Sequence, residues 1–318
     1  MKSTTLLFLL CQSLLAHSQA YNSLISSAEK HYHDSAYAKS AALYQRAAKL
    51  RRATRSDSYN AACSAALAGD TTLAMGFLKS AVAAGYTDIR HIQTDADLNG
   101  LHKLSGWVTL TNAIQKKFDL LEAAYDKPLQ TELLAIYDDD QNYRLKYEQV
   151  SRKFGFDSKQ SQMLWDTINR LDSINLSKVK SILTRSGWVG PDQVGGQASM
   201  TLFLIVQHAD LATQKTYLPM MRSAVKRKTA EPSALALLED RVALGEGRKQ
   251  LYGSQIGTDN AGKSFVRPLI DPDHVDQRRA RMGLEPMAEY VAQQNIKWNV
   301  ADYKRRIRTY VKLEKGLE

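Results

Sequence analysis

Charged side chains lie in the apolar stripes of several expected helices. In "AIYDDDQNYRLKY", residues 135–147, Asp140 and Arg144 both fall within about 20° of Leu133 on a helical wheel. His208 has the same kind of position in "SMTLFLIVQHADLATQ", and Arg241 in "PSALALLEDRVALG". A carboxylate, a guanidinium and an imidazole could together bind a polar ligand or move a proton, because imidazole titrates near neutral pH.

These charges predict that the helices meet. An ion moved into a low-dielectric interior costs roughly several kcal/mol unless it is paired and hydrogen-bonded. We therefore expect one shared polar cluster with two carboxylate–guanidinium pairs, completed by polar neighbours on the same segments and on the following β-hairpin. The residues of this predicted cluster are Asp140, Gln141, Arg144, Gln207, His208, Asp210, Asp240, Arg241, Tyr252 and Gln255.

Three interpretations of the predicted cluster stay open: a salt-bridge network that fixes helix register, a ligand site, and a catalytic site. Catalysis would make His208 a general base or a metal ligand, oriented by Asp210 or Asp240. Networks of buried charges perturb pKa values whether or not they catalyse. The structural interpretation is favoured because the chain shows no recognisable nucleophile motif.

The elements that would position the cluster belong to a domain expected at 128–296. The segment around His208 is apolar almost all round, which predicts a buried central helix. A third helix is expected from Pro232 to Gly245, and a β-hairpin near 251–270. In the hairpin segment, Gly253 indicates a bulge or a close backbone approach. A basic helix, 297–318, should close the chain.

One stretch of the hairpin mimics a nucleotide-binding loop. "GTDNAGKS", residues 257–264, has the G-x-x-x-x-G-K-S spacing, but that chemistry needs a helix after the loop. The residues that follow, "FVRPLIDPD", contain two prolines and no helical period. We therefore expect no nucleotide and no other cofactor, and we assign no metal site.

The N-terminal part, 21–127, shows a period of 34 residues. Small and large apolar positions recur at this spacing in "SSAEKHYHDSAYAKSAALYQRAAKL" and "NAACSAALAGDTTLAMGFLKSAVAAGY". Both segments, within about 21–86, resemble tetratricopeptide repeats, which implies a helical scaffold that binds a protein or a peptide. Because repeats bury their faces against neighbours, helices at 107–125 should complete the stack. The aligned pairs are Ala28 with Ala62, Ser40 with Ala74, Tyr44 with Leu78, and Ala47 with Ala81.

The second part of the chain, about 128–295, resembles an uncharacterised bacterial domain of unknown function. The matching pieces are "DQNYR", "GWVGPDQVGGQAS", "VQHAD", "LLEDRV", "QLYGSQ" and "VDQRRARMGLEPMAEY". The resemblance implies no activity. The expected fold class is mainly α, with a tetratricopeptide-like helical module followed by an α-helical domain that carries one small hairpin.

Residues 1–20 are typical of a cleaved export signal, with Lys2 before the apolar run "LLFLLCQSLLA" and small residues before the cleavage position after Ala20. The mature chain would then be periplasmic or extracellular, without a transmembrane span. It would keep one cysteine, Cys63, which lies in an apolar helical pattern and is expected in the core.

The net charge of +10 has its clearest local excess at 297–318, with seven Lys or Arg against three Asp or Glu. An exported chain rarely encounters nucleic acid, so we expect none; we expect an anionic envelope surface to be the partner of this helix. The function that the sequence favours is an exported binding or scaffold protein that recognises an envelope protein or peptide. The alternative is a hydrolase-like enzyme with a buried His208/Asp/Arg cluster.

Overall fold

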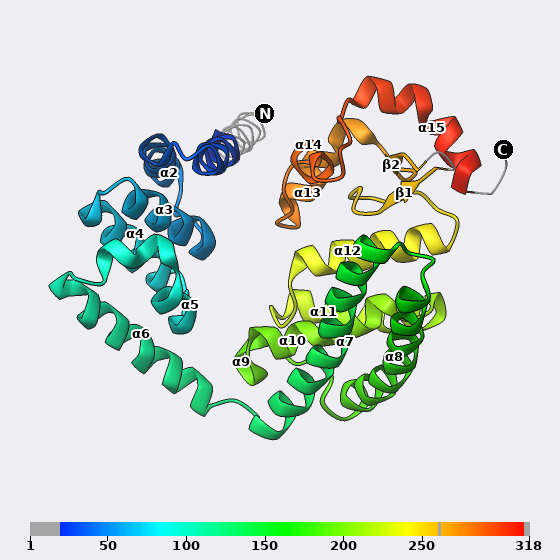
Figure 1. The fold of residues 1–318 in the computed structure, drawn as a ribbon, viewed down its shortest axis with the longest axis horizontal. Coiled ribbons are helices and arrows are strands. Elements are labelled where there is room, and N and C mark those ends of the chain that lie inside the picture. The colour runs from blue at the N-terminus through cyan, green and yellow to red at the C-terminus, as the bar shows by residue number, and fades with distance from the viewer. Residues whose placement is uncertain (1–19, 260–261, 315–318) are drawn as a thin grey trace, which may run out of the picture. The chain divides into compact units, whose positions relative to one another are not determined.

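The computed structural model describes residues 20–259 and 262–314. Helices dominate, and the described residues contain one sheet, a two-stranded antiparallel hairpin (Figure 1), so the predicted mainly α fold is confirmed. The chain forms two compact units, Met1–Ala123 and Ala124–Glu318. Of the predicted export signal only Ala20 is described; the rest lies outside the described residues. No described helix is both long and apolar enough to cross a membrane.

The first unit is built of short helices. Several of them begin at a side chain that accepts a hydrogen bond from the backbone of the first turn, as Thr54 does from Asp57 N and Asp70 from Leu73 N. Residues 20–33 are helical. The elements that follow are α2 (Tyr37–Leu50), α3 (Arg55–Leu67), α4 (Thr71–Ala83), α5 (Ile89–Thr94), the 3₁₀ helix η1 (Ala96–Leu101) and α6 (Ser105–Ala123).

The positions that recur every 34 residues form the core of this unit, and both members of each aligned pair are buried. Ser40 replaces the usual alanine without leaving a polar group unpaired, because its hydroxyl donates to the Ala28 carbonyl at 2.7 Å and lies 2.9 Å from Ser64 Oγ. Helix α6 places Trp107 and Ile114 in the same core, as expected for helices that complete a stack. The tetratricopeptide assignment itself stays a prediction.

The second unit starts with two long helices and four shorter ones around a large apolar core. Leu133 and Ile136 of the first long helix pack there with Ile182 and Val206. The third expected helix has the predicted bounds, with Pro232 in its first turn and Gly245 at its end. The helices are α7 (Lys127–Phe154), α8 (Lys159–Ser186), α9 (Pro191–Val194), α10 (Gly196–His208), α11 (Leu211–Lys226) and α12 (Pro232–Gly245).

Helix α10 is the central element of this bundle. Seven of its thirteen residues are buried, and it packs against α7, α8 and α12. Its sequence is apolar almost all round because its neighbours cover it on several sides. His208 is its last residue, two positions before Asp210, the N-cap of α11. The expected buried central helix is therefore confirmed, with the histidine at its end.

The described residues after α12 form a smaller apolar core in the second unit, which includes Val266, Leu269, Met287 and Tyr303. The hairpin pairs Gly257 with Phe265, and "GTDNAGKS" runs into a strand where a phosphate loop would run into a helix. The elements are β1 (Ile256–Thr258), β2 (Ser264–Val266), the 3₁₀ helix η2 (Pro272–His274), α13 (Val275–Arg281), α14 (Met287–Ala292) and α15 (Val300–Glu314).

Candidate functional site

Asp140 on α7 is the centre of a polar cluster inside the second unit. Its side chain is buried, and its Oδ1 accepts hydrogen bonds from Arg144 Nε at 3.2 Å and Arg144 Nη2 at 3.1 Å. The same oxygen lies 3.1 Å from His208 Nδ1 at the end of α10. Gln141 donates to the other oxygen at 2.6 Å. The structure thus brings together four of the ten residues of the predicted cluster.

The ionisation of Asp140 determines the tautomer of His208. Burial alone would raise the pKa of the Asp140 carboxyl, but the hydrogen bond and charge of His208 and those of Arg144 hold this pKa below its usual value of 3.8. An ionised carboxylate only accepts hydrogen bonds, so His208 Nδ1 must carry the proton and donate it. In the neutral ring, Nε2 is then the basic nitrogen, and it makes no hydrogen bond to any of the described residues.

Asp172 on α8 belongs to this cluster although the sequence reasoning did not include it. Arg144 Nη2 donates to Asp172 Oδ1 at 2.6 Å, so one guanidinium links the carboxylates of two helices. Of the two carboxylate–guanidinium pairs expected among the predicted residues, only Arg144–Asp140 forms; the second carboxylate of Arg144 is Asp172, outside the prediction. The signal was present in the sequence, because Asp172 lies between Ile168 and Val179 on the buried face of α8.

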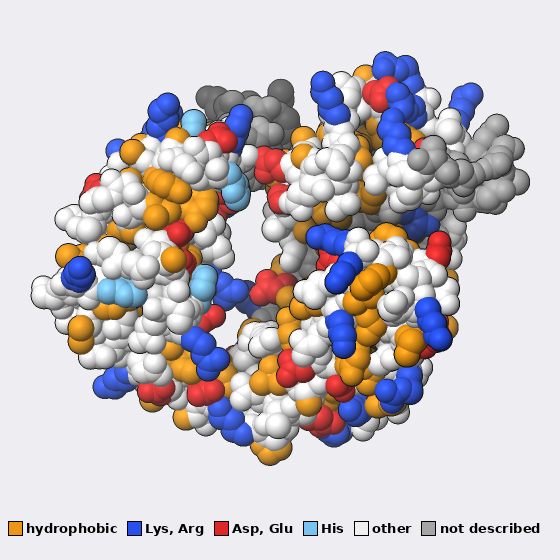
Figure 2. Space-filling view, in the orientation of Figure 1, with side chains coloured by type: hydrophobic (Ala, Val, Ile, Leu, Met, Phe, Trp, Pro, Cys, Tyr) orange, Lys and Arg blue, Asp and Glu red, His pale blue; other side chains and the backbone are white. Residues whose placement is uncertain are grey.

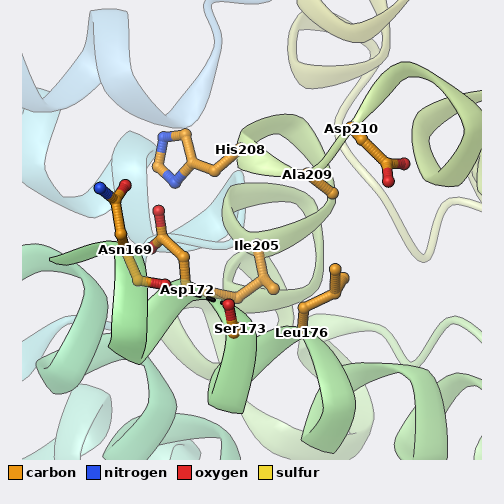
Figure 3. A pocket seen from close by; sticks show the side chains of 8 residues that line it. All are labelled: Asn169, Asp172, Ser173, Leu176, Ile205, His208, Ala209 and Asp210. Carbon is orange, nitrogen blue, oxygen red and sulfur yellow. Dashed lines mark hydrogen bonds between the residues drawn. The ribbon is translucent and has the colours of Figure 1, made fainter. Parts of the chain in front are cut away.

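A surface pocket of about 310 Å³ opens beside His208, whose side chain remains 21% exposed. Its polar lining comes mainly from α8, while the ends of α10 and α11 supply the rest. Figure 3 shows Asp172 and Asn169 next to the imidazole, with Asp210 turned away from it. The lining residues are Asn169, Asp172, Ser173, Leu176, Ile205, His208, Ala209 and Asp210.

Asp240 lies in a different polar site, which corrects the prediction of one shared cluster. Its carboxylate is fully buried and accepts backbone N–H groups of Leu251 at 2.6 Å, Tyr252 at 3.0 Å and Ser254 at 2.9 Å. Burial raises the pKa of Asp240, and these hydrogen bonds oppose the rise. Helical periodicity shows which residues share a buried face; it does not show that a loop, rather than α7, covers that face.

The loop held by Asp240 also accounts for other predicted residues. Tyr252 donates its hydroxyl to Glu239 at 3.1 Å, and Gln255 Nε2 donates to Ser254 Oγ at 3.0 Å, so neither contacts the cluster around Asp140. Arg279, which the sequence reasoning missed, is buried and donates to the carbonyl of Tyr252 at 2.7 Å. In this second site the side chains of Asp240 and Arg279 hold the backbone of the loop 251–254, which is a structural role.

Three further predicted residues have other positions. Asp210 caps α11 by accepting from Thr213 N at 2.7 Å, and that hydrogen bond lowers its pKa. Gln207 is buried, and its backbone carbonyl accepts a hydrogen bond from the side-chain amide of Gln214. Arg241 makes no ion pair with the described residues, its Nε is buried without a hydrogen bond to them, and burial lowers its pKa. None of the three supports His208 in the way the prediction required.

Oxygen and nitrogen atoms of Asp140, Asp172 and His208 lie within 4.8 Å of one another, a spacing that could hold a metal ion. Arg144 already donates to both carboxylates, and His208 Nδ1 donates to Asp140. An ion would therefore have to displace a guanidinium from the same oxygens. The hydrogen bonds of the cluster fit proton transfer better than metal binding.

Comparison with known proteins identifies the second unit. No curated protein and no solved structure matches the chain. Residues 127–299, more than half of the chain, match a family of unknown function, DUF6624. This range agrees with the domain of unknown function expected at about 128–295. The chain therefore belongs to the DUF6624 family.

Proposed function

We propose that the second unit is a hydrolase-like catalytic domain in which His208 is the general base. The observation that supports this role is the 3.1 Å contact between His208 Nδ1 and the buried carboxylate of Asp140, at the edge of an open pocket. A histidine fixed in this way has its tautomer set by the carboxylate, which leaves Nε2 as the nitrogen that can accept a proton from a bound molecule. Asp140 therefore takes the orienting role that the sequence predicted for Asp210 or Asp240.

The proposed reaction is hydrolysis. His208 Nε2 takes a proton from a water molecule while the water oxygen bonds to the electrophilic centre of the substrate. The imidazolium then returns that proton to the leaving group as its bond breaks. Asp140 stabilises the imidazolium that forms in between, and Arg144 keeps Asp140 ionised. Asn169, which Figure 3 shows beside the imidazole, is the side chain that we propose donates a hydrogen bond to the oxygen on which negative charge develops.

The pocket suggests the class of substrate. Its volume of about 310 Å³ lies at the lower end of small-molecule sites. Leu176 and Ile205 add apolar surface to its lining, and Asp172 and Asp210 add carboxylates. We expect a small substrate with an apolar segment and a neutral or cationic polar group.

The test uses His208→Asn in the full chain, because the asparagine amide can still donate to Asp140 while the basic Nε2 is removed. Wild type and variant are compared on nitrophenyl esters, anilides, phosphate esters and glycosides. We expect a hydrolysed class whose rate falls by about 10²-fold or more at unchanged melting temperature. His274→Asn, an exposed histidine paired with Asp271, is the matched control and should keep the wild-type rate.

Two results would contradict the proposal. Hydrolysis that is equally fast in the wild type and in His208→Asn would show that Nε2 takes no part. A large drop in the melting temperature of His208→Asn, with no hydrolysis by the wild type, would instead make the cluster a structural network.

For the first unit we propose the binding role that its repeat pattern implies, with a protein or peptide partner. A pocket of about 270 Å³ among its helices supports this role. We further propose that the chain is exported, as residues 1–20 indicate, so that the partner is an envelope component. Fractionation of the native cells, with N-terminal sequencing of the protein recovered, tests the location and the cleavage after Ala20.

We also propose that helix α15 binds an anionic envelope surface. Lys304, Arg305, Arg306 and Arg308 are exposed on it, and Figure 2 shows blue side chains gathered over this helix. Several of these cations also pair with nearby acids, as Lys304 does with Asp273. Sedimentation with phosphatidylglycerol vesicles tests the proposal, since binding should weaken as added salt screens the charges.

A further inference from the structure

The pocket of the first unit combines acids and aromatic rings without any lysine or arginine in its lining. Its volume is about 270 Å³, and one end of η1 and the faces of α3 and the first helix border it. Three carboxylates point to a preference for positive charge. The lining residues are Glu29, Tyr32, His33, Tyr44, Tyr59, Asn60, Cys63, His91, Asp95 and Asp97.

Neutral donors hold the carboxylates of this pocket in place. Tyr59 donates its hydroxyl to Asp95 Oδ2 at 2.6 Å, the thiol of Cys63 lies 3.6 Å from the same oxygen, and Tyr32 donates to Asp97. Burial and the nearby carboxylate of Asp95 raise the pKa of both Tyr59 and Cys63. These donors therefore stay protonated and orient the carboxylates without adding positive charge. His91 Nε2 also lies 3.8 Å from Asp95 Oδ2, so Asp97 is the acid of the pair that has no cationic partner in the lining.

Aromatic rings of Tyr32, Tyr44 and Tyr59 belong to the lining of the pocket. The ring of Tyr59 stacks on Tyr86 with centroids 4.4 Å apart and lies 5.0 Å from the ring of His91. The faces of such rings attract a cation through their quadrupole. Carboxylates next to aromatic rings are surroundings that an organic ammonium group prefers, because its charge and its carbon chain are both accommodated.

We propose that this pocket binds a primary ammonium group on a short alkyl chain. A lysine side chain of a peptide carries this group, and so does a free alkylamine. The first source deepens the peptide-binding role proposed for this unit and rests on it, whereas the second does not. Cys63, Asp95 and Asp97 also have spacing that could hold a metal ion, but a protonated thiol is a poor ligand.

The first experiment titrates the isotopically labelled full chain with n-butylammonium chloride and follows the amide and tyrosine resonances. Equal concentrations of n-butanol with potassium chloride serve as the neutral ligand at matched ionic strength. We expect saturable shifts at Tyr32, Tyr59 and Asp95 with the ammonium and none with the alcohol. Equal shifts with both ligands, or shifts that map elsewhere, would overturn the proposal.

Asp97→Asn removes one charge yet keeps an oxygen that can accept the Tyr32 hydroxyl. We expect it to weaken n-butylammonium binding by about tenfold or more. The control is Asp119→Asn on α6, where an exposed carboxylate accepts from Gln115, and its affinity should equal that of the wild type. If Asp97→Asn unfolds, Glu29→Gln is tested in its place. Unchanged affinity in the pocket variant, or an equal loss in the control, refutes the site.

A second experiment, with peptides, distinguishes the ammonium site from the peptide-binding role proposed for this unit. The probe is an acetylated, amidated pentapeptide with one lysine between serines and glycines, and its partner has norleucine in place of lysine. Binding of only the lysine peptide, lost in Asp97→Asn, supports both proposals. Binding of n-butylammonium alone supports the ammonium site and contradicts the peptide role. Binding of both peptides without any effect of Asp97→Asn, or tight binding of zinc chloride that blocks the Cys63 thiol, overturns the ammonium site.

Discussion

At the scale of the residue, the candidate site depends on Asp140. This carboxylate is buried and receives donors from Arg144, His208 and Gln141, so its charge is compensated from two helices. Asp240 is equally buried but is compensated by backbone N–H groups. Two aspartates in apolar stripes therefore have different roles. One orients a histidine at a pocket, and the other fixes a loop.

Asp140→Asn should destabilise the second unit by about 1–3 kcal/mol near neutral pH, because Arg144 and His208 lose a charged acceptor. The folded state lowers the pKa of Asp140 below 3.8, so its stabilising effect is complete above that value and disappears as the pH falls through the lower, folded-state pKa. The difference in the free energy of unfolding between wild type and variant should therefore shrink in acid. Urea unfolding of both proteins, at neutral pH and in acid below the folded-state pKa of Asp140, measures this difference.

Asp139→Asn is the control for this comparison. Asp139 is the preceding residue, and its carboxylate lies 4.0 Å from Lys178 near the surface. An exposed pair of this kind contributes about 0–1 kcal/mol, so the control should unfold almost as the wild type does. A penalty for Asp140→Asn that is the same in acid as at neutral pH would contradict the ionised state assigned to this side chain.

Helical periodicity predicted part of the site and missed part of it for physical reasons. Asp140, Arg144 and His208 were found because each breaks an apolar stripe, and a buried charge needs a partner. The same rule applied to 159–186 would have found Asp172. The partners of Asp240 could not be found in this way, because backbone N–H groups of a loop leave no trace in the side-chain pattern.

At the scale of the element, the turn after α12 shows how backbone groups position the smaller core. Gly253 has φ +71°, and a Cβ there would lie 2.8 Å from the sulfur of the buried Met287. The expected close backbone approach at Gly253 is thus confirmed. The side chains of Asp240 and Gln250 satisfy the N–H groups around it.

Gly253→Ala should cost about 2–4 kcal/mol, since the left-handed backbone and the overlap with Met287 both oppose a methyl group. Gly283→Ala is the matched control. Gly283 has φ +69° with nothing within 4 Å of its Cβ position, so only the backbone contribution of about 1 kcal/mol applies. Chemical unfolding measures both variants. Equal losses in the two would show that Met287 moves aside at no cost.

At the scale of the whole molecule, the chain consists of two units with separate apolar cores. Composition and periodicity predicted the mainly α class because long amphipathic patterns are the most reliable local signal. They could not supply the activity, since the polar groups that would perform it come from α7, α8 and α10, and only tertiary packing brings these together.

Because the cores are separate, we expect two calorimetric unfolding transitions. Asp140→Asn should lower the midpoint of one transition and leave the other within experimental error. Trp107 is the one tryptophan of the first unit among the four in the chain, so replacing the other three assigns the transitions by fluorescence. A single transition that shifts as a whole would mean that the units unfold together.

The pairing of Asp140 with His208 is tested most directly by nitrogen NMR of the His208 ring at a pH where the ring is neutral. Wild type should show the tautomer with the proton on Nδ1 and an unprotonated Nε2. In Asp140→Asn the population should shift toward the tautomer with the proton on Nε2. A wild-type ring protonated on Nε2, or a ring that does not respond to the loss of the Asp140 charge, would contradict the proposed base.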